Sequence, residues 1–223
     1  AQAGDEHRRL ALQNLAVVIP GDPQTDGAGV RSVREAWVRS LAMTTRPRRA
    51  RREHHGPLRV GYVSSFFHRA NWMKPVWGLI NQHDRNRYRV RLFSFGPVPG
   101  CEEEATATTA YRPHETDRVF DVEHVDNDRV AKLIADEEID VLVDLNGYSD
   151  PQRLGVLFSR PAPIIIGWFN MYATTGMRSF DYLIGDRYVV RIGEEQDYSE
   201  RILRVPGSYL TFEVAYPVPE VAT

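Results

Sequence analysis

The stretch VLVDLNGYSD, residues 141–150, begins as an apolar strand and stops abruptly in small polar groups. Its first half is almost continuously apolar, as expected of a strand that is covered on both faces of a parallel sheet. Its second half, Asn146-Gly147-Tyr148-Ser149, favours a turn near solvent. In open α/β sheets ligands bind outside the carboxyl ends of the strands, so this strand end is a candidate binding site.

Apolar strands alternate with helical segments on both sides of this stretch. Strands are predicted at 58–65, 88–96, 117–124, 141–148, 163–169 and 180–186, and helices at 72–83, 126–139 and 151–160. Such alternation favours a parallel sheet with right-handed crossovers. We therefore expect a Rossmann-like, doubly wound α/β lobe over residues 58–223.

A helical extension is predicted before this lobe. Leucines and valines recur at helical spacing over 5–19 and 28–43, with a break at Pro20-Gly21, so residues 1–45 are expected to be helical. Residues 46–57 form a polar linker with five arginines between positions 46 and 52. A solvated linker is one interpretation of this run, and a patch for nucleic acid or phospholipid is the other.

The composition is that of a soluble globular protein. The chain has 223 residues, of which 42% are hydrophobic and 26% charged, and its formal net charge is -2. This charge gives no overall attraction to nucleic acid or to an anionic membrane, and no apolar run approaches the roughly 18 residues of a membrane span. The single cysteine, Cys101, suits a reducing compartment, so we expect a cytoplasmic protein. The N-terminus lacks an initiator Met and a signal peptide, so a piece of a longer protein is expected.

Polar side chains gather at three predicted strand ends. They are Ser64, Ser65, His68, Arg69, Asn71 and Lys74 after the first strand, Asn146, Gly147 and Tyr148 after the fourth, and Asn170, Tyr172, Thr174, Thr175 and Gly176 after the fifth. Amides, hydroxyls and a few charges suit a sugar or a nucleotide-sugar better than a metal, so no metal site is expected. For any one of these residues, building a turn or capping a helix is as good an interpretation as contact with a ligand.

The order of these motifs resembles the O-GlcNAc transferase family of glycosyltransferases. The resemblance extends over nearly the whole chain and is strongest in the block from Ile139 to Asp186. That block holds a D-L-N-G-Y strand end, the sequence R-P-A-P, a short apolar strand, T-x-G and a segment similar to D-Y-I-x-D, which is here FDYLIGD. The first two helices, with REAW at 34–37, resemble the segment that joins the family's tetratricopeptide repeats to its catalytic region.

The resemblance implies one lobe of a two-lobed enzyme. The chain is similar to the N-terminal lobe, so the second Rossmann-like lobe and the repeat array are implied partners that the chain lacks, and the chain alone should hardly turn over a sugar nucleotide. The implied reaction moves a sugar, GlcNAc first among the candidates, from UDP-GlcNAc to a Ser or Thr hydroxyl of a protein acceptor. It inverts the anomeric carbon, and it needs no cofactor, metal or covalent intermediate.

The resemblance and the local chemistry also suggest roles for single residues. His68 is the candidate general base or proton relay, because its reference pKa of about 6.5 suits that work. Asn71, Asn170 and Tyr172 are candidates for contact with sugar hydroxyls. Lys74, which like Asn71 lies near the start of the helix after the first strand, is a further binding candidate. The remaining binding candidates keep the family pattern: Asn146, Tyr148, Arg153, Thr174 and Thr175.

Several positions depart from the family pattern. The histidine of the family's D-F-x-x-H context falls on Ala70, and its G-Y-P-G-T loop is here Asn170-Met171-Tyr172-Ala173-Thr174. An Asp and a His of the family fall on Lys132 and Ala135. These losses favour one alternative, a catalytically degenerate module that binds other proteins. A different sugar-nucleotide enzyme on the same architecture, such as an epimerase, is a further alternative.

Overall fold

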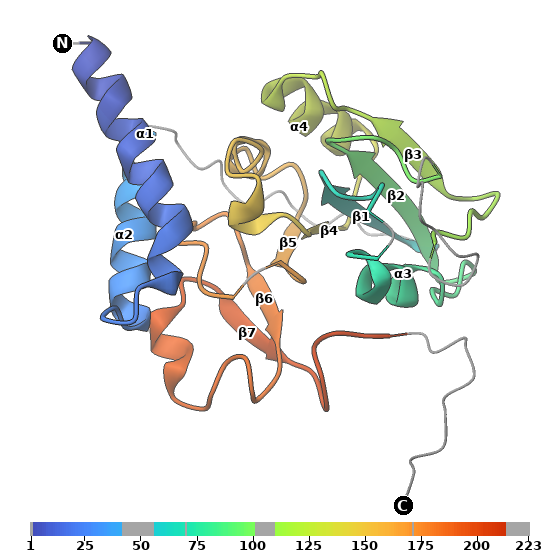
Figure 1. The fold of residues 1–223 in the computed structure, drawn as a ribbon. Helices are drawn as coiled ribbons and strands as arrows, with labels where there is room; N and C mark the ends of the chain where they lie inside the picture. Colours follow the sequence, from blue (N-terminus) through green and yellow to red (C-terminus); the bar gives the residue numbers. More distant parts are fainter. Residues whose placement is uncertain (1, 42–55, 70, 101–109, 171, 213–223) are drawn as a thin grey trace, which may run out of the picture.

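The computed structural model describes residues 2–41, 56–69, 71–100, 110–170 and 172–212. Over these residues seven strands form one parallel sheet in the order β3-β2-β1-β4-β5-β6-β7 (Figure 1). The strands are β1 (Leu58–Ser64), β2 (Tyr88–Ser94), β3 (Arg118–Asp121), β4 (Val141–Asp144), β5 (Ile164–Gly167), β6 (Tyr182–Gly185) and β7 (Arg201–Arg204). The strand order reverses between β1 and β4, so this sheet is Rossmann-like and its topological switch point lies between these two strands.

The helices follow the predicted order. They are α1 (Gln2–Val18), α2 (Gly27–Ser40), α3 (Lys74–Ile80), α4 (Asn127–Asp136) and α5 (Gly155–Phe158), with the short 3-10 helices η1 (Ile19–Gly21), η2 (Gly147–Ser149) and η3 (Glu194–Asp197). Asp126 caps α4, since its Oδ1 accepts the N–H of Arg129 at 2.9 Å. The expected α/β lobe with a helical extension is confirmed.

Several elements differ from the prediction. The strand expected over 141–148 ends at Asp144, and the helix expected over 151–160 shrinks to the four residues of α5. Strand β7 was not predicted at all. It pairs only with β6, at the edge of the sheet, and its sequence RILR is mostly exposed, so it carries no apolar run that a pattern could detect.

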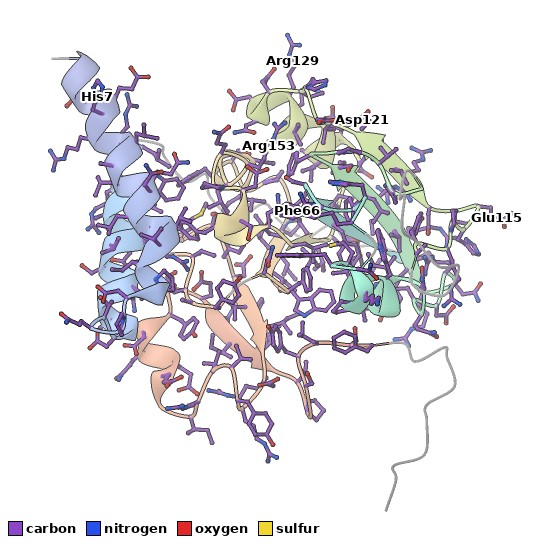
Figure 2. All side chains as sticks on the ribbon, viewed as in Figure 1. His7, Phe66, Glu115, Asp121, Arg129 and Arg153 are labelled. Atoms are coloured by element: carbon purple, nitrogen blue, oxygen red, sulfur yellow. The ribbon has the colours of Figure 1, made fainter. Side chains whose placement is uncertain are left out.

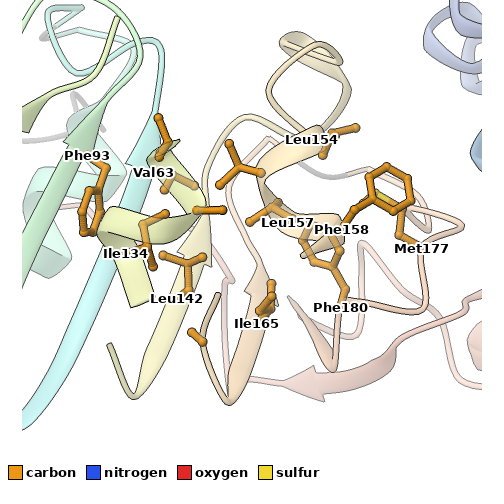
Figure 3. Close-up of a cluster of buried hydrophobic side chains, with 14 of the residues drawn as sticks. Val63, Phe93, Ile134, Leu142, Leu154, Leu157, Phe158, Ile165, Met177 and Phe180 are labelled. Carbon is orange, nitrogen blue, oxygen red and sulfur yellow. The ribbon is translucent and has the colours of Figure 1, made fainter. Parts of the chain in front are cut away.

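Two apolar clusters cover the two faces of the sheet. Alternating residues of β1 divide between them, because Val60 and Tyr62 belong to the cluster that α3 covers and Val63 belongs to the cluster under α4 and α5. Figure 3 shows the second cluster, in which Leu142 of β4 lies between Ile134 of α4 and Ile165 of β5. A doubly wound sheet needs both of these layers.

The helical extension packs on the lobe. Helices α1 and α2 lie side by side next to the β6–β7 end of the sheet (Figure 1). Ala16 of α1 and Trp37 of α2 are buried in the same cluster as Tyr148 and Met177. The expected boundary near residue 45 and the arginine-rich linker of residues 46–57 fall almost entirely outside the described residues.

Truncation of Leu142 tests the core. Its side chain is fully buried, so Leu142→Ala should lower the free energy of unfolding by about 2–5 kcal/mol, the usual cost of emptying such a site. Leu10→Ala removes the same atoms from a half-exposed position and should change it by less than about 0.5 kcal/mol. Urea denaturation measures both, and equal effects would contradict the assigned core.

Candidate functional site

The carboxyl ends of β1 and β4 are tied together at the switch point. Val63 pairs with Asp144, and Asp144 in turn pairs with Gly167 of β5, so these three strands end level with one another. Beyond them, Asn146 binds Ser65 twice: its Oδ1 accepts the Ser65 N–H at 2.8 Å and its Nδ2 donates to Ser65 Oγ at 3.1 Å. The Ser65 hydroxyl also donates to Asp150. The Asn146 side chain thus links the segments that follow β1 and β4 by two hydrogen bonds.

The Asp144 carboxylate stabilises the turn at which β4 ends. It is almost completely buried, and it accepts the N–H of Asn146 at 3.1 Å and that of Gly147 at 3.0 Å. Gly147 takes a φ of 51°, which glycine adopts at little cost. Burial raises the pKa of Asp144 to about 6, although the two N–H donors oppose the shift. This carboxylate therefore titrates near neutral pH beside the strand end.

Two polar atoms close to the ends of β1 and β5 are among six buried side-chain atoms that have no hydrogen-bond partner in the described part of the chain. They are Nδ1 of His68, after β1, and Nδ2 of Asn170, after β5, and both are buried. The His68 ring lies beside the end of β2, where its Cε1 would be 3.7 Å from a Cβ at Gly96. Buried polar groups are usually paired, so two unpaired ones at the switch-point edge suit a ligand.

The backbone that presents Asn170 is in an unusual conformation. Phe169 has a φ of 70°, and the Asn170 N–H donates to the carbonyl of Trp168 at 2.9 Å, which closes a three-residue turn. A bulky residue in this left-handed region is strained and persists only where its surroundings impose it. Strain of this kind occurs preferentially at functional sites.

Aromatic rings connect the loops after β1 and β5. Trp72, whose side chain is 47% exposed, lies 5.9 Å from Phe66 and 6.5 Å from Phe169 between ring centroids. Figure 2 shows Phe66 near the centre of the molecule. The exposed Tyr172 belongs to the loop after β5. This edge therefore combines aromatic faces with amide and imidazole groups, a combination that suits a sugar ring.

The other predicted binding residues lie in different surroundings. Tyr148, Thr174 and Thr175 are buried together, and the Tyr148 hydroxyl donates to the carbonyl of Thr175 at 2.7 Å. Among the described residues no hydrogen bond or ring contact joins His68 to Tyr148 or Thr174.

Arg153 holds two loops together. Its guanidinium donates to the carbonyl of Val125 at 2.7 Å and to that of Glu123, and it lies over the ring of Phe95. Asn71, in the loop between β1 and α3, and Lys74, the first residue of α3, are exposed at the edge where His68 and Trp72 also lie. Their roles in binding stay predictions.

Sequence reasoning missed the acidic residues of this region. Asp144 and Asp150 flank the N-G-Y motif and were visible beside it, whereas Glu200 lies just before β7, outside the motifs named from the sequence. The described residues contain no group of three or more His, Cys, Asp or Glu side chains that could hold a metal ion. Within the same residues, no helix is long and apolar enough to cross a membrane.

The comparison with protein families decides the assignment, since the model of glycosyl transferase family 41 matches residues 42–218. The chain belongs to this family. Among the relatives is a rice (Oryza sativa subsp. japonica) protein named as a probable UDP-N-acetylglucosamine--peptide N-acetylglucosaminyltransferase SPINDLY, which is 30% identical over 173 residues. That alignment covers 74% of this chain and 17% of the rice protein. The SEC protein of Arabidopsis thaliana, with a name of the same type, is 29% identical over 68% of this chain and 15% of its own length.

A solved structure gives the same result. The chain matches the K341M mutant of the Thermobaculum terrenum O-GlcNAc transferase with a TM-score of 0.76 and 28% identity. The match covers 91% of this chain and 38% of that one. The expected family is therefore confirmed, and this chain spans less than a fifth of the length of the two plant relatives.

The titration of Asp144 can be measured through stability. Because its folded-state pKa lies above the unfolded value of 3.8, the folded protein binds more protons between these values, and Asp144 destabilises the fold as pH rises from about 3.8 to about 6. Asp144→Asn should remove this dependence. The free energy of unfolding of the parent, relative to the variant, should therefore fall by roughly 2–4 kcal/mol across that range.

Urea titrations at a series of pH values measure this difference. Glu115→Gln, at an exposed position, is the control and should keep the parent's pH profile. A parent and an Asp144→Asn variant with parallel profiles would show that Asp144 titrates normally.

Proposed function

We propose that this chain is part of an inverting glycosyltransferase that moves GlcNAc from UDP-GlcNAc to Ser or Thr hydroxyls of proteins. Membership of family 41 and the names of the relatives support the reaction class. The observation that carries the site assignment is a pair of buried atoms, His68 Nδ1 and Asn170 Nδ2, which have no partner within the described residues and lie at the carboxyl edge beside the switch point.

In the proposed reaction the acceptor hydroxyl oxygen attacks the anomeric carbon, and the bond from that carbon to the diphosphate oxygen breaks. The diphosphate leaves with the electron pair, and the hydroxyl proton passes to the imidazole of His68. Histidine suits this role because its ordinary pKa is about 6.5, near the working pH. Direct displacement of this kind inverts the anomeric carbon.

This lobe would form the acceptor-side wall of the sugar site. Asn170 Nδ2 would donate to a sugar oxygen, and the rings of Trp72 and Phe169 would cover the apolar face of the sugar. The exposed residues at the same edge, Asn71, Lys74 and Tyr172, would supply further polar contacts. We propose that this activity is cytoplasmic, because a chain with a single cysteine has no internal disulfide and suits a reducing compartment.

The reaction would also require parts of a longer protein. Negative charge builds on the leaving diphosphate, and cationic groups or a helix N-terminus must stabilise it. We propose that a second Rossmann-like lobe supplies them, because this chain matches only 38% of the solved relative. A tetratricopeptide array would select the protein acceptors, and the lobe without these parts would be inactive.

A transfer assay with the full-length protein tests this function. The protein is incubated separately with radiolabelled UDP-GlcNAc, GDP-fucose and UDP-glucose in a cell lysate, and label on protein is counted. We expect transfer from UDP-GlcNAc. Transfer from another donor alone would correct the sugar, and neither transfer nor hydrolysis from any donor would favour a non-catalytic module of the family.

Substitution of His68 tests the proposed base. His68→Ala should lower kcat by about 100-fold or more, the usual contribution of a general base. His124→Ala, which changes an exposed histidine in the same lobe, should keep the parent's kcat. Full activity of His68→Ala would remove this assignment and leave the transferase function standing.

A further inference from the structure

Four motifs that are far apart in the sequence meet in one buried junction. The junction consists of Arg34 and Trp37 of α2, Tyr148 of η2, the turn Thr174–Gly176, and Glu200 before β7. Arg34 is 3% exposed and Glu200 is 4% exposed. Two opposite charges are therefore enclosed on either side of a short turn, which demands a structural or functional reason.

Glu200 binds the turn from the β7 side. Its Oε2 accepts the Thr174 hydroxyl at 2.7 Å, and its Oε1 accepts the Thr175 N–H at 2.7 Å as well as the Thr175 hydroxyl. The two hydroxyl oxygens in turn accept backbone N–H groups, from Gly176 at 3.1 Å and from Met177 at 3.0 Å. Both threonine side chains are thus fully engaged within the protein.

Arg34 binds the turn from the α2 side. Its Nη1 donates to the carbonyl of Thr174 at 2.7 Å, and its Nε donates to the carbonyl of Ala16 in α1 at 3.1 Å. The guanidinium carbon lies 3.9 Å from the ring centroid of Tyr148, whose hydroxyl donates to the carbonyl of Thr175 at 2.7 Å. One arginine therefore joins both extension helices, the N-G-Y motif and the turn.

Helix α2 also leaves no room for a side chain at the third residue of the turn. Gly176 has a φ of 69°, which favours glycine. A Cβ there would lie 2.9 Å from the backbone nitrogen of Glu35 and 3.0 Å from Arg34. The turn thus packs directly against the helix backbone.

We infer that Arg34 and Glu200 are positioning residues, which fix the turn Thr174–Gly176 and thereby aim the preceding loop that carries Asn170. Thr174 and Thr175 serve this turn and do not bind the substrate. The helical extension is then part of the support of the site. The effect on catalysis rests on the proposed function, whereas the fixing of the turn does not.

Amide hydrogen exchange tests the fixing of the turn without any activity. Arg34→Lys keeps the charge but loses the fork that spans Ala16 and Thr174, and Glu200→Gln keeps the shape but loses the charge. In the full-length protein, exchange of the Thr175 and Gly176 amides should speed up at least tenfold in both variants. Exchange in β4, around Leu142, should stay within threefold of the parent.

Arg160→Lys is the matched control. Arg160 is similarly buried and donates to two backbone carbonyls and to Asp181, and none of these partners belongs to the turn Thr174–Gly176. Its variant should leave the Thr175 and Gly176 amides unchanged. Unchanged exchange in Arg34→Lys, or an equal effect of Arg160→Lys, would overturn the inference.

Kinetics test the effect on the reaction. If the turn aims Asn170, Arg34→Lys should lower kcat by about 10- to 100-fold, because small misplacements at a site have large effects, and should change the KM for the donor by less than threefold. Faster exchange with an unchanged kcat would overturn the catalytic part. If the parent shows no transfer, the proposed function fails, while the exchange data still decide the role of the turn.

Discussion

The ending of β4 is the constraint on which the site depends. The chain turns at Asp144 because one buried carboxylate accepts two successive backbone N–H groups, and this turn brings the Asn146 amide to Ser65 at the end of β1. Parallel pairing aligns β1, β4 and β5, so their loops emerge at the same edge. Every group proposed to bind the sugar follows from this alignment.

The polar residues of these motifs fall into two groups. His68 and Asn170 have buried polar atoms that find no partner among the described residues, so they are candidates for contact with a ligand. Tyr148, Thr174 and Thr175 direct their hydroxyls to groups inside the fold. The second group is no less specific in sequence, because each of these three buried hydroxyls needs a partner of the right shape and charge.

The sequence predicted the sheet and its switch-point edge. It did not predict which polar residues bond inside the fold and which are candidates for contact with a ligand. Strand β4 was evident because its apolar run is buried on both faces, whereas β7 was missed because an edge strand reading RILR carries little apolar signal. The role of Thr174 depends on Glu200, which lies 26 residues later, and on Arg34, which lies 140 residues earlier. Local patterns contain no information on such partners, so a buried polar residue and a binding residue look alike.

The most direct test is a crystal structure of the full-length protein with UDP-GlcNAc bound. We expect the sugar to lie at the carboxyl ends of β1, β4 and β5. Asn170 Nδ2 should be within hydrogen-bonding distance of a sugar oxygen, and the His68 ring should face the anomeric carbon. A sugar bound at another edge, with His68 Nδ1 and Asn170 Nδ2 still unpaired, would contradict it.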